Sequence, residues 1–292
     1  MMLSFVVIFL LIAVRADSLS LPNDTLHLPN KRAGSELWRH TTFHSGSQML
    51  SDFKPQALWG ENSLSVASDP AGGSGDVLRV HYDKGSYSKT HDKARGAAFY
   101  SHVTSSHTTM MLSYDVFFSS NFDFVKGGKL PGLWGGTTTG TCTGGHRADT
   151  CFTTRFMWRA DGQGEVYAYI PKTQRSDFCD DSHVQCNDHY GNSLGRGTWH
   201  FKKNHWQNIA QYVHLNTPGK TDGYLRVFLD GHKVYEIKNI AVRAKDSVKI
   251  DGIIFSTFFG GSDSEWAATQ SCYTYFRNFV LSMDPSHPTI IG

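Results

Sequence analysis

The chain has 292 residues and a formal net charge of +2, with 39% hydrophobic, 13% aromatic and 18% charged residues. A charge this close to zero disfavours a nucleic-acid binder and gives no electrostatic reason to expect another particular partner. The high content of glycine and aromatic residues, together with only five glutamates, favours strands and tight turns over a large helical domain.

The N-terminal segment, residues 1–16, is a short apolar run. It is too short for a typical membrane span, so it predicts a secretory signal peptide cleaved near Ala16 in preference to a membrane anchor. No later apolar run is long enough to span a bilayer, and no membrane association is expected after cleavage. Residues 17–32 are expected to be an unstructured leader or propeptide, and residues 33–292 a single domain.

Two features of the leader are sites that could be modified during secretion. Asn23 begins the sequon Asn23-Asp24-Thr25, which can be glycosylated only in a secreted protein. Lys31-Arg32 is either a dibasic processing site or an ordinary exposed basic pair. Together with the apolar run, these features favour an extracellular location.

Runs rich in β-branched and aromatic residues predict strands along the rest of the chain. They lie at 76–82, 97–100, 108–118, 124–130, 151–170 as a hairpin, 205–213, 224–229, 233–237, 250–259 and 271–283. One long loop is expected to open at 131–136 and run to 150, and a second is expected at 171–198. No stretch shows sustained helical periodicity. This order predicts an all-β fold, an antiparallel β-sandwich of jelly-roll type with a concave substrate cleft.

The hairpin at 151–170 has one polar and one apolar face, because side chains alternate across a strand. The polar face carries Thr153, Arg155, Met157, Arg159, Glu165, Tyr167 and Tyr169, and the apolar face carries Phe156, Trp158, Val166, Ala168 and Ile170. Pairing of Arg159 with Glu165 would place Arg155 opposite Tyr169. A face of this composition suits an anionic, hydroxyl-rich substrate.

The polar face offers the groups that β-elimination on a uronic acid polymer needs. Arg155 provides a planar cationic fork for a carboxylate, and Lys126 and Lys129 provide cations near the sheet. Neutralising the sugar carboxylate makes the neighbouring C5 proton more acidic. The pKa of a tyrosine, about 10 in water, is expected to fall beside these cations, so that Tyr167 or Tyr169 can act as base or acid. This chemistry requires no metal and no cofactor.

An oxidising compartment favours disulfides among the five cysteines. The pairs Cys142–Cys151 and Cys179–Cys186 would close two short loops and leave Cys272 as a buried thiol. A zinc site is the competing interpretation, but no close Cys-x-x-Cys pair is present. We therefore expect disulfides and no metal site.

Two motifs, FVKGGKLPGLWGG at 124–136 and CFTTRFMWRADGQGEVYAYIP at 151–171, resemble those of polysaccharide lyase family fourteen, in particular the secreted alginate lyases of marine molluscs. The resemblance spans most of the chain after the leader. It implies a jelly roll with the active site in a cleft on the concave sheet, and it implies the same two disulfides. By motif position it implies the catalytic residues Lys126, Arg155, Tyr167 and Tyr169.

The resemblance leaves the choice of lysine open between Lys126 and Lys129. Strand parity puts the two on opposite faces unless the diglycine at 127–128 forms a bulge, and Lys126 is preferred. The family often has a serine at the position of Thr153, so a hydroxyl is retained here. Tyr169, acting with Tyr167, is the favoured acid and base.

Further side chains are candidates for substrate binding. They are Thr153, Lys129, Arg159, Trp134 and His146, with Trp266 as another aromatic candidate. For the tryptophans and His146, a place in the core or on the surface is an equal or better interpretation.

The expected function is that of a secreted, monomeric lyase acting on an acidic polysaccharide. The resemblance makes mannuronate-rich alginate the expected substrate and digestive fluid the expected location, with a glucuronan-type lyase as the alternative. A non-catalytic glycan-binding module would need the cations but not the paired tyrosines. A glycoside hydrolase usually needs two suitably spaced carboxylates, whereas the central motif contains only one glutamate, Glu165.

Overall fold

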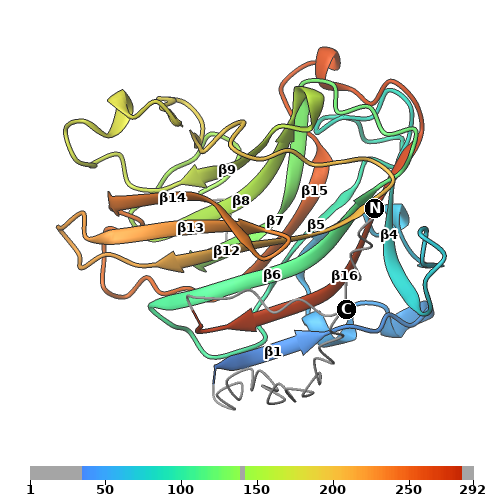
Figure 1. Ribbon diagram of the computed structural model, residues 1–292, viewed down its shortest axis with the longest axis horizontal. Helices are drawn as coiled ribbons and strands as arrows, with labels where there is room; N and C mark the ends of the chain where they lie inside the picture. Colours follow the sequence, from blue (N-terminus) through green and yellow to red (C-terminus); the bar gives the residue numbers. More distant parts are fainter. Residues whose placement is uncertain (1–34, 139–141, 285–292) are drawn as a thin grey trace, which may run out of the picture. The chain divides into compact units, whose positions relative to one another are not determined.

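The computed structural model describes residues 35–138 and 142–284, which belong to one unit of the chain, Gly34–Gly292. The expected signal peptide, the leader and Asn23 lie outside the described residues. The described part consists of antiparallel strands and short 3-10 turns, without an α-helix; in particular, it has no helix long and apolar enough to cross a membrane. Figure 1 shows two sheets stacked on each other. The predicted all-β jelly-roll sandwich is confirmed.

The first sheet, named here the β6 sheet, has eight strands. Their spatial order is β14 (His232–Ile240), β13 (Gly223–Leu229), β12 (Trp206–His214), β6 (Thr109–Phe118), β16 (Cys272–Ser282), β4 (Asp76–Tyr82) and β3 (Leu64–Ser68), and β1 (Glu36–His40) also pairs with β16. Most of these strands match the ranges expected from the sequence to within a few residues.

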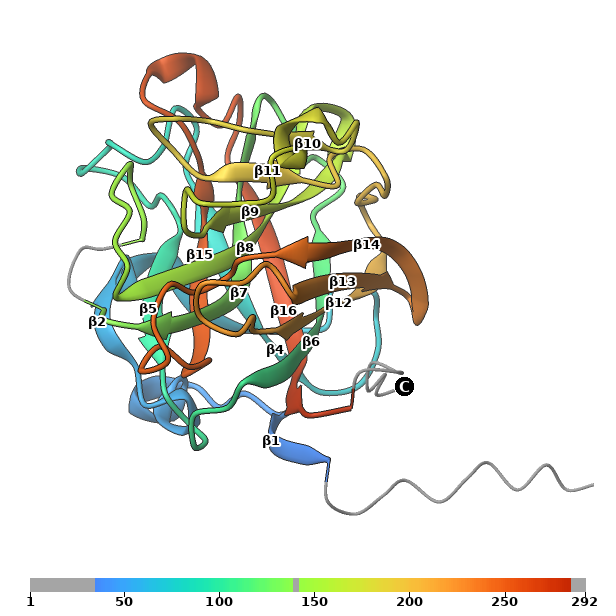
Figure 2. The same cartoon turned by 90° about the vertical axis from the view of Figure 1, so that its left-hand side faces the viewer.

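The second sheet, named here the β8 sheet, also has eight strands and carries the central hairpin. Their order is β10 (Val184–Gln185), β11 (Asn192–Leu194), β9 (Gly164–Tyr169), β8 (Cys151–Arg159), β7 (Gly127–Gly136), β15 (Gly252–Phe259), β5 (Ala97–Ser101) and β2 (Gln56–Trp59). Figure 2 shows β10 and β11 at one edge of this sheet. These two short strands lie within the segment 171–198, which the sequence analysis treated as a loop.

Single 3-10 turns connect several strands. They are η1 (Gly46–Gln48), η2 (Ser51–Phe53), η3 (Glu61–Ser63), η4 (Ala160–Gly162), η5 (Phe178–Asp180) and η6 (Ser264–Trp266). Two of them matter for the site, because η4 forms the turn of the central hairpin and η6 lies beside the pocket described below.

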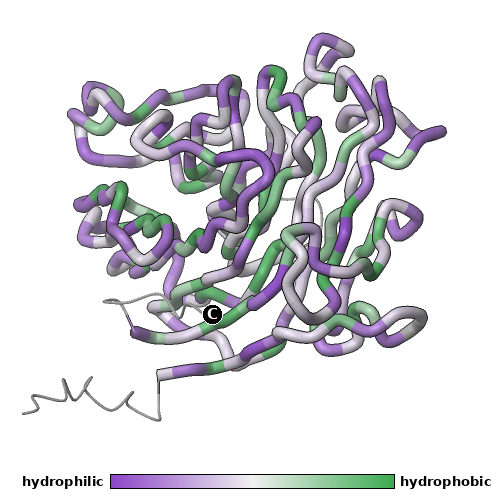
Figure 3. The backbone as a smooth tube through the Cα atoms, turned by 45° about the vertical axis from the view of Figure 1, so that its right-hand side comes forward, coloured by the Kyte–Doolittle hydropathy of each residue, from purple (hydrophilic) through white to green (hydrophobic). Residues whose placement is uncertain are grey.

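The core lies between the two sheets and contains the apolar face of the hairpin. Phe156, Trp158, Val166 and Ala168 are all completely buried there. Trp158 contacts four aromatic rings, and its indole Nε1 donates to the carbonyl of Phe124 over 3.2 Å. Figure 3 shows hydrophobic residues along the central strands and hydrophilic residues along many of the loops. Because this face is fixed in the core, the polar face of the same hairpin must point outward.

Strand β7 continues to Gly136, although the expected strand ended at residue 130 and residues 131–136 were expected to open a loop. Gly132 permits close packing here: a Cβ atom at this position would lie 2.1 Å from the carbonyl oxygen of Thr154. Pro131 is tolerated because the pairing of β7 with both neighbouring strands is irregular between Lys129 and Gly132. The Pro131-Gly132 pair, a dipeptide that usually indicates a turn, therefore lies within an irregular strand.

The hairpin pairs in a different register from the expected one. Arg155 lies opposite Tyr167, and Thr153 lies opposite Tyr169. Asp161, at the turn, has a positive φ of 58°, and this local conformation was not visible in the sequence. The partner of Arg155 is displaced by two residues, which equals the period of side-chain alternation along a strand. The polar side chains therefore still share one face.

Candidate active site

A pocket of about 540 Å³ lies over the polar face of the β8–β9 hairpin. It is lined by five of the predicted site residues, Lys129, Arg155, Arg159, Tyr167 and Tyr169. Its other walls come from the loops around Ser88, Thr143, Asn187, Tyr190 and Ser262, and from Trp266. Residues far apart in the sequence therefore converge on one face of the β8 sheet.

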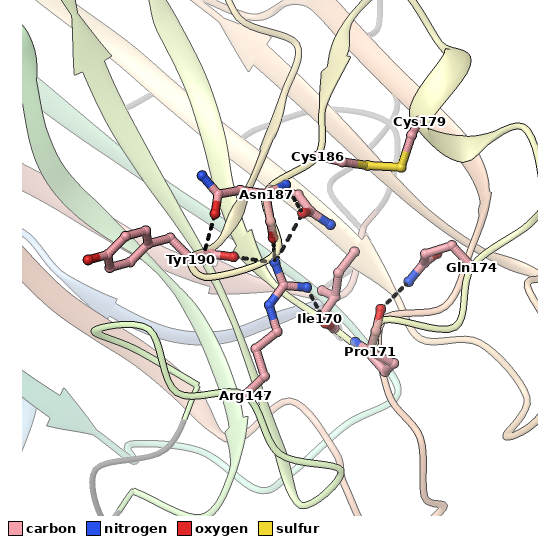
Figure 4. The surroundings of a disulfide bond; sticks show 9 residues. Arg147, Ile170, Pro171, Gln174, Cys179, Cys186, Asn187 and Tyr190 are labelled. Carbon is pink, nitrogen blue, oxygen red and sulfur yellow. Dashed lines mark hydrogen bonds between the residues drawn. A yellow bond between two sulfur atoms is a disulfide. The ribbon is translucent and has the colours of Figure 1, made fainter.

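Two disulfides hold loops beside the pocket, and both predicted pairs are confirmed. Cys142–Cys151 closes the loop that contains Thr143 and Gly144. Cys179–Cys186 ties the loop that leads to Asn187, as Figure 4 shows. Cys272 is a buried free thiol, and burial raises its pKa to about 12. It is therefore protonated and poorly reactive at neutral pH.

Tyr167 and Tyr169 form a close pair on β9. Their ring centres are 5.5 Å apart and their planes are nearly perpendicular, at 83°. The backbone N–H of Gly145 donates to the hydroxyl oxygen of Tyr169 over 2.8 Å, and that of Gly191 donates to Tyr167 over 3.2 Å. Each phenol oxygen is thus held by a different loop.

The pKa of Tyr167 is raised, which corrects the expectation that neighbouring cations lower it. Burial is the largest cause, followed by the charge and the hydroxyl group of Tyr169; the cation Arg155 opposes them only weakly. Tyr167 therefore holds its proton more tightly than a tyrosine in water does. The two phenols have different environments although they are two residues apart.

Lys129, and not the preferred Lys126, lies in the pocket. Lys129 is paired with Met157 across the β7–β8 ladder, so it shares the polar face of the hairpin, and only 8% of it is exposed. Its Nζ lies 4.1 Å from the ring centre of Tyr167 and 2.9 Å from Sδ of Met157. Lys126 precedes β7, is exposed and forms an ion pair with Glu265. The preference for Lys126 was based on strand parity, which the start of β7 at Gly127 made unreliable.

Burial and like charges act together on Lys129. Its pKa is lowered well below the ordinary value, first by burial and then by repulsion from Arg155 and Arg159. Arg155 is only 3% exposed, and its Nη1 and Nη2 donate to the hydroxyls of Ser256 and Thr143 over 3.2 and 3.1 Å. Neither Lys129 nor Arg155 forms an ion pair within residues 35–138 and 142–284, and Nε of Arg155 has no hydrogen-bond partner there. Both charges are available to an anion.

Glu165 is engaged by two other arginines. It is completely buried, and its carboxylate contacts Arg159 and Arg196 over 2.6 Å each and accepts from the hydroxyl of Ser193 over 2.5 Å. Burial alone would raise the pKa of Glu165, but the two arginines lower it by more. Throughout the described ranges, no cluster of three or more His, Cys, Asp or Glu side chains is arranged to hold a metal ion.

Of the other sequence candidates, Trp266 lines the pocket, whereas Thr153, Trp134 and His146 lie around it. Thr153 is buried beneath it, and its hydroxyl donates to the carbonyl of Cys142 over 2.8 Å, which supports the disulfide loop. Trp134 is buried at 4% exposure against Tyr100, and His146 is exposed on the Cys142–Cys151 loop. Trp266 does line the pocket, with the Arg159 guanidinium 5.8 Å from its ring centre.

Sequence reasoning missed Arg147, which joins the two disulfide loops. Its Nη2 donates to the carbonyls of Asn187, over 2.7 Å, and Tyr190, and to Oδ1 of Asn192 over 3.0 Å, and Figure 4 shows the guanidinium between these groups. Its guanidinium is also 5.9 Å from the ring centre of Tyr169. No motif indicates this contact, because these three partners are 40 to 45 residues away in the chain.

A family model described as polysaccharide lyase 14 matches residues 70–279, which include the whole hairpin and the cations of the pocket. The chain belongs to the polysaccharide lyase 14 family. The match confirms the resemblance that the two sequence motifs carry. It also covers most strands of both sheets, so it describes the fold as well as the site.

Two solved structures are similar to this polysaccharide lyase 14 chain. A marine alginate lyase from Aplysia kurodai is 43% identical, with a TM-score of 0.79 over 85% of this chain and 99% of that one. An endo-β-1,4-glucuronan lyase from the fungus Trichoderma reesei is 10% identical, with a TM-score of 0.58 over 88% of this chain and 100% of that one. The second likeness shows the fold alone.

A curated viral protein shares part of the same sequence. Exolysin of Paramecium bursaria Chlorella virus 1 is 28% identical over 179 residues, which are 52% of this chain and 26% of the viral protein. The chain thus matches about a quarter of the length of that relative.

Proposed function

We propose that the protein is a secreted alginate lyase that cleaves mannuronate-rich polymer by β-elimination. The observation that carries this proposal is the pair Tyr167 and Tyr169 beside two cations, Arg155 and Lys129, whose charges are not neutralised by any described carboxylate. The 43% identity to an alginate lyase supports alginate as the polymer. The preference for mannuronate follows from the resemblance to the mollusc enzymes.

Arg155 and Lys129 are proposed to bind and neutralise the carboxylate of the sugar that loses its C5 proton. Both side chains are buried, and an anion is attracted more strongly in such a site than in water. A bound carboxylate is an opposite charge and raises the lowered pKa of Lys129 again, so that the amine carries its proton when substrate is present. Neutralising the carboxylate stabilises the carbanion-like charge that develops on removal of the proton.

The two tyrosines are proposed to divide the proton transfers. Tyr169 acts as a phenolate and removes the C5 proton, while Tyr167 donates its proton to O4 as the C4–O4 bond breaks and the C4–C5 double bond forms. The raised pKa of Tyr167 supports its role as the proton donor, because burial keeps this phenol protonated. The N–H group of Gly145 stabilises the phenolate oxygen of Tyr169 by a charge-assisted hydrogen bond. One proton leaves the sugar and one returns to it.

Two alternatives fit the same pocket less well. A glucuronan lyase would use the same chemistry on a polymer of different stereochemistry, but the named glucuronan lyase shares only the fold with this chain. A non-catalytic glycan-binding module would need the cations without a pair of phenols held by separate backbone N–H groups. The proposed alginate lyase uses both the cations and the pair of phenols.

Release of unsaturated uronate, followed by its ultraviolet absorbance, tests the proposal. Purified mature protein is given polymannuronate, polyguluronate and glucuronan, beside Tyr169→Phe and a control, Tyr275→Phe, which alters a tyrosine on the β6 sheet. We expect absorbance to rise most on polymannuronate, and to rise with the control but not with Tyr169→Phe. Binding of these polymers without any rise would contradict the lyase and support the binding module.

Secretion and the monomeric state are part of the proposal. The two disulfides support an oxidising compartment. Expression of the full chain in a secreting host, followed by mass determination of the mature protein and light scattering, tests both. Retention of residues 1–16 in the mature protein would contradict the signal peptide, and a dimeric mass would contradict the monomer.

A further inference from the structure

A second pocket, of about 470 Å³, lies on the other side of the Cys142–Cys151 loop. Thr143 and Gly144 of this loop line the first pocket, whereas Cys142, Arg147, Ala148 and Asp149 line the second. The loop is therefore a shared wall. The opposite walls come from residues 170–173, 216–221 and 241–244, which are separate in the sequence.

The lining of this pocket carries an excess of positive charge. Four cationic residues, Arg147, Lys172, Lys220 and Arg243, line it together with one carboxylate, that of Asp149. Arg243 forms an ion pair with Asp246 over 3.1 Å. The other three cations have no ion-pair partner in the described parts of the chain, and Lys172 and Lys220 are exposed.

Arg147 contributes a charge that is held in place but not neutralised. All its hydrogen-bond acceptors are carbonyl or amide oxygens, which fix the guanidinium without cancelling its charge. Its Nε is buried and has no hydrogen-bond partner among the described residues. The guanidinium charge therefore adds to the positive charge of the pocket lining.

The walls of the pocket are braced by hydrogen bonds within the protein. Nε2 of Gln174 donates to the carbonyls of Pro171 and Ala241 over 2.8 and 2.7 Å, and Oε1 of Gln174 accepts from the N–H of Ala241 over 2.9 Å. Figure 4 shows Gln174 beside Pro171 and the Arg147 guanidinium directed toward the carbonyl of Ile170. A cavity formed in this way before binding, and of this volume, has the dimensions of a small-ligand site.

We propose that this second pocket binds a uronate unit of the acidic polysaccharide and anchors the chain outside the reaction site. Lys172 and Lys220 take the sugar carboxylate as point charges, and the hydroxyls of Thr173 and Thr221 are available to the sugar hydroxyls. The choice of a uronate rests on the proposed function, because the polymer in the first pocket is itself a polyanion. A chain that occupies both pockets gains affinity through effective concentration.

The dependence of KM on substrate length tests this anchoring site. Lys172→Gln/Lys220→Gln removes both exposed charges, and Lys54→Gln/Lys202→Gln removes two exposed charges elsewhere as a matched control. We expect the first variant to raise KM for long polymannuronate by roughly three- to tenfold. Its kcat on the polymer should stay unchanged. Its KM for trimannuronate should change less than its KM for the polymer, because a trisaccharide has only one sugar beyond the two that flank the cleaved bond. An equal effect on polymer and trisaccharide, or none on the polymer, would overturn the proposal.

Calorimetric titration separates this proposal from the proposed function. Oligomannuronate is titrated into Tyr169→Phe, which keeps both pockets but not the proposed base. A weaker affinity, or the loss of one of two binding events, when Lys172→Gln/Lys220→Gln is added supports the second site even if no polymer is cleaved by the wild-type protein. A single binding event that the lysine changes leave intact would overturn the proposed second site. It would not bear on the lyase reaction, which the absorbance assay tests separately.

Discussion

Nζ of Lys129 lies 4.1 Å from the ring centre of Tyr167. This contact joins a cation that has no carboxylate partner among the described residues to one member of the tyrosine pair. The amine faces the π electrons of the ring, which attract a cation, and Arg155 and Arg159 repel it from the other directions. The proposed carboxylate site and the proposed proton donor are therefore neighbours.

The two lysines of the KGGK motif should differ sharply in importance. Lys129→Met keeps the length of the side chain but removes the buried charge, so we expect kcat/KM to fall by roughly a hundredfold or more. Lys126→Met removes only an exposed ion pair with Glu265 and should change kcat/KM by less than about threefold. Steady-state kinetics on polymannuronate measures both. A larger loss with Lys126→Met would place the catalytic cation outside the pocket.

The lowered pKa of Lys129 predicts a pH dependence of substrate binding. Burial and the neighbouring arginines favour the neutral amine, so in the free enzyme its positive charge is lost at a pH well below 10.5. KM for the uronate polymer should therefore rise as the pH increases through this lowered pKa. Lys129→Arg keeps its charge and should show no such rise. The same KM profile in both proteins would assign the effect to another group.

Arg147 should act on catalysis through the loops that it joins. Arg147→Ala frees the Asn187–Gly191 segment and the Gly145 loop. The backbone N–H groups of Gly191 and Gly145 position the tyrosine hydroxyls, so kcat should fall by roughly ten- to a hundredfold with a smaller change in KM. Arg147→Lys keeps a donor and should recover part of kcat.

A matched control separates this effect from a general loss of stability. Arg175→Ala removes ion pairs with Asp177 and Asp181 in the neighbouring loop, outside the pocket, and should leave kcat unchanged. Thermal unfolding of both alanine variants is measured alongside the kinetics. An equal drop in kcat for the two variants would show that Arg147 has no particular role in positioning the tyrosines.

Glu165 should stabilise the folded protein in a pH-dependent way. Glu165→Gln leaves Arg159 and Arg196 without their buried counter-charge, and we expect the free energy of unfolding to fall by about 3 to 5 kcal/mol at neutral pH. The folded-state pKa of Glu165 lies below its ordinary value of 4.5, so its contribution is present above that pH and is lost as the pH falls through the lowered pKa.

Urea unfolding at neutral and acidic pH measures this contribution. The difference between wild type and Glu165→Gln should shrink as the pH falls below 4.5. A difference that stays constant with pH would mean that the variant acts by disturbing packing and not by removing a charge. Asp177→Asn, which removes an exposed carboxylate, is the control and should have little effect at either pH.

The sequence predicted those parts of the site that depend on short-range pattern. Alternation in 151–170 placed Arg155, Tyr167 and Tyr169 on one face, and the spacing of the cysteines indicated both disulfides. These features depend only on the geometry of a strand and on short loops.

Features that depend on irregular backbone or on contacts between distant segments could not be predicted from the sequence. The choice between Lys126 and Lys129 depends on where β7 begins and on its broken pairing near Pro131. The raised pKa of Tyr167 depends on burial, which outweighs the neighbouring cations, and Arg147 contacts segments that only the fold brings near.

The most direct test of the central claim is mass spectrometry of the products made from polymannuronate in water enriched with heavy oxygen. β-Elimination breaks the C4–O4 bond without adding water. We therefore predict new non-reducing ends that are lighter than a hydrolysis product by one water and that contain no heavy oxygen. Saturated products carrying one heavy oxygen for each cleavage would contradict the account, because they would require hydrolysis.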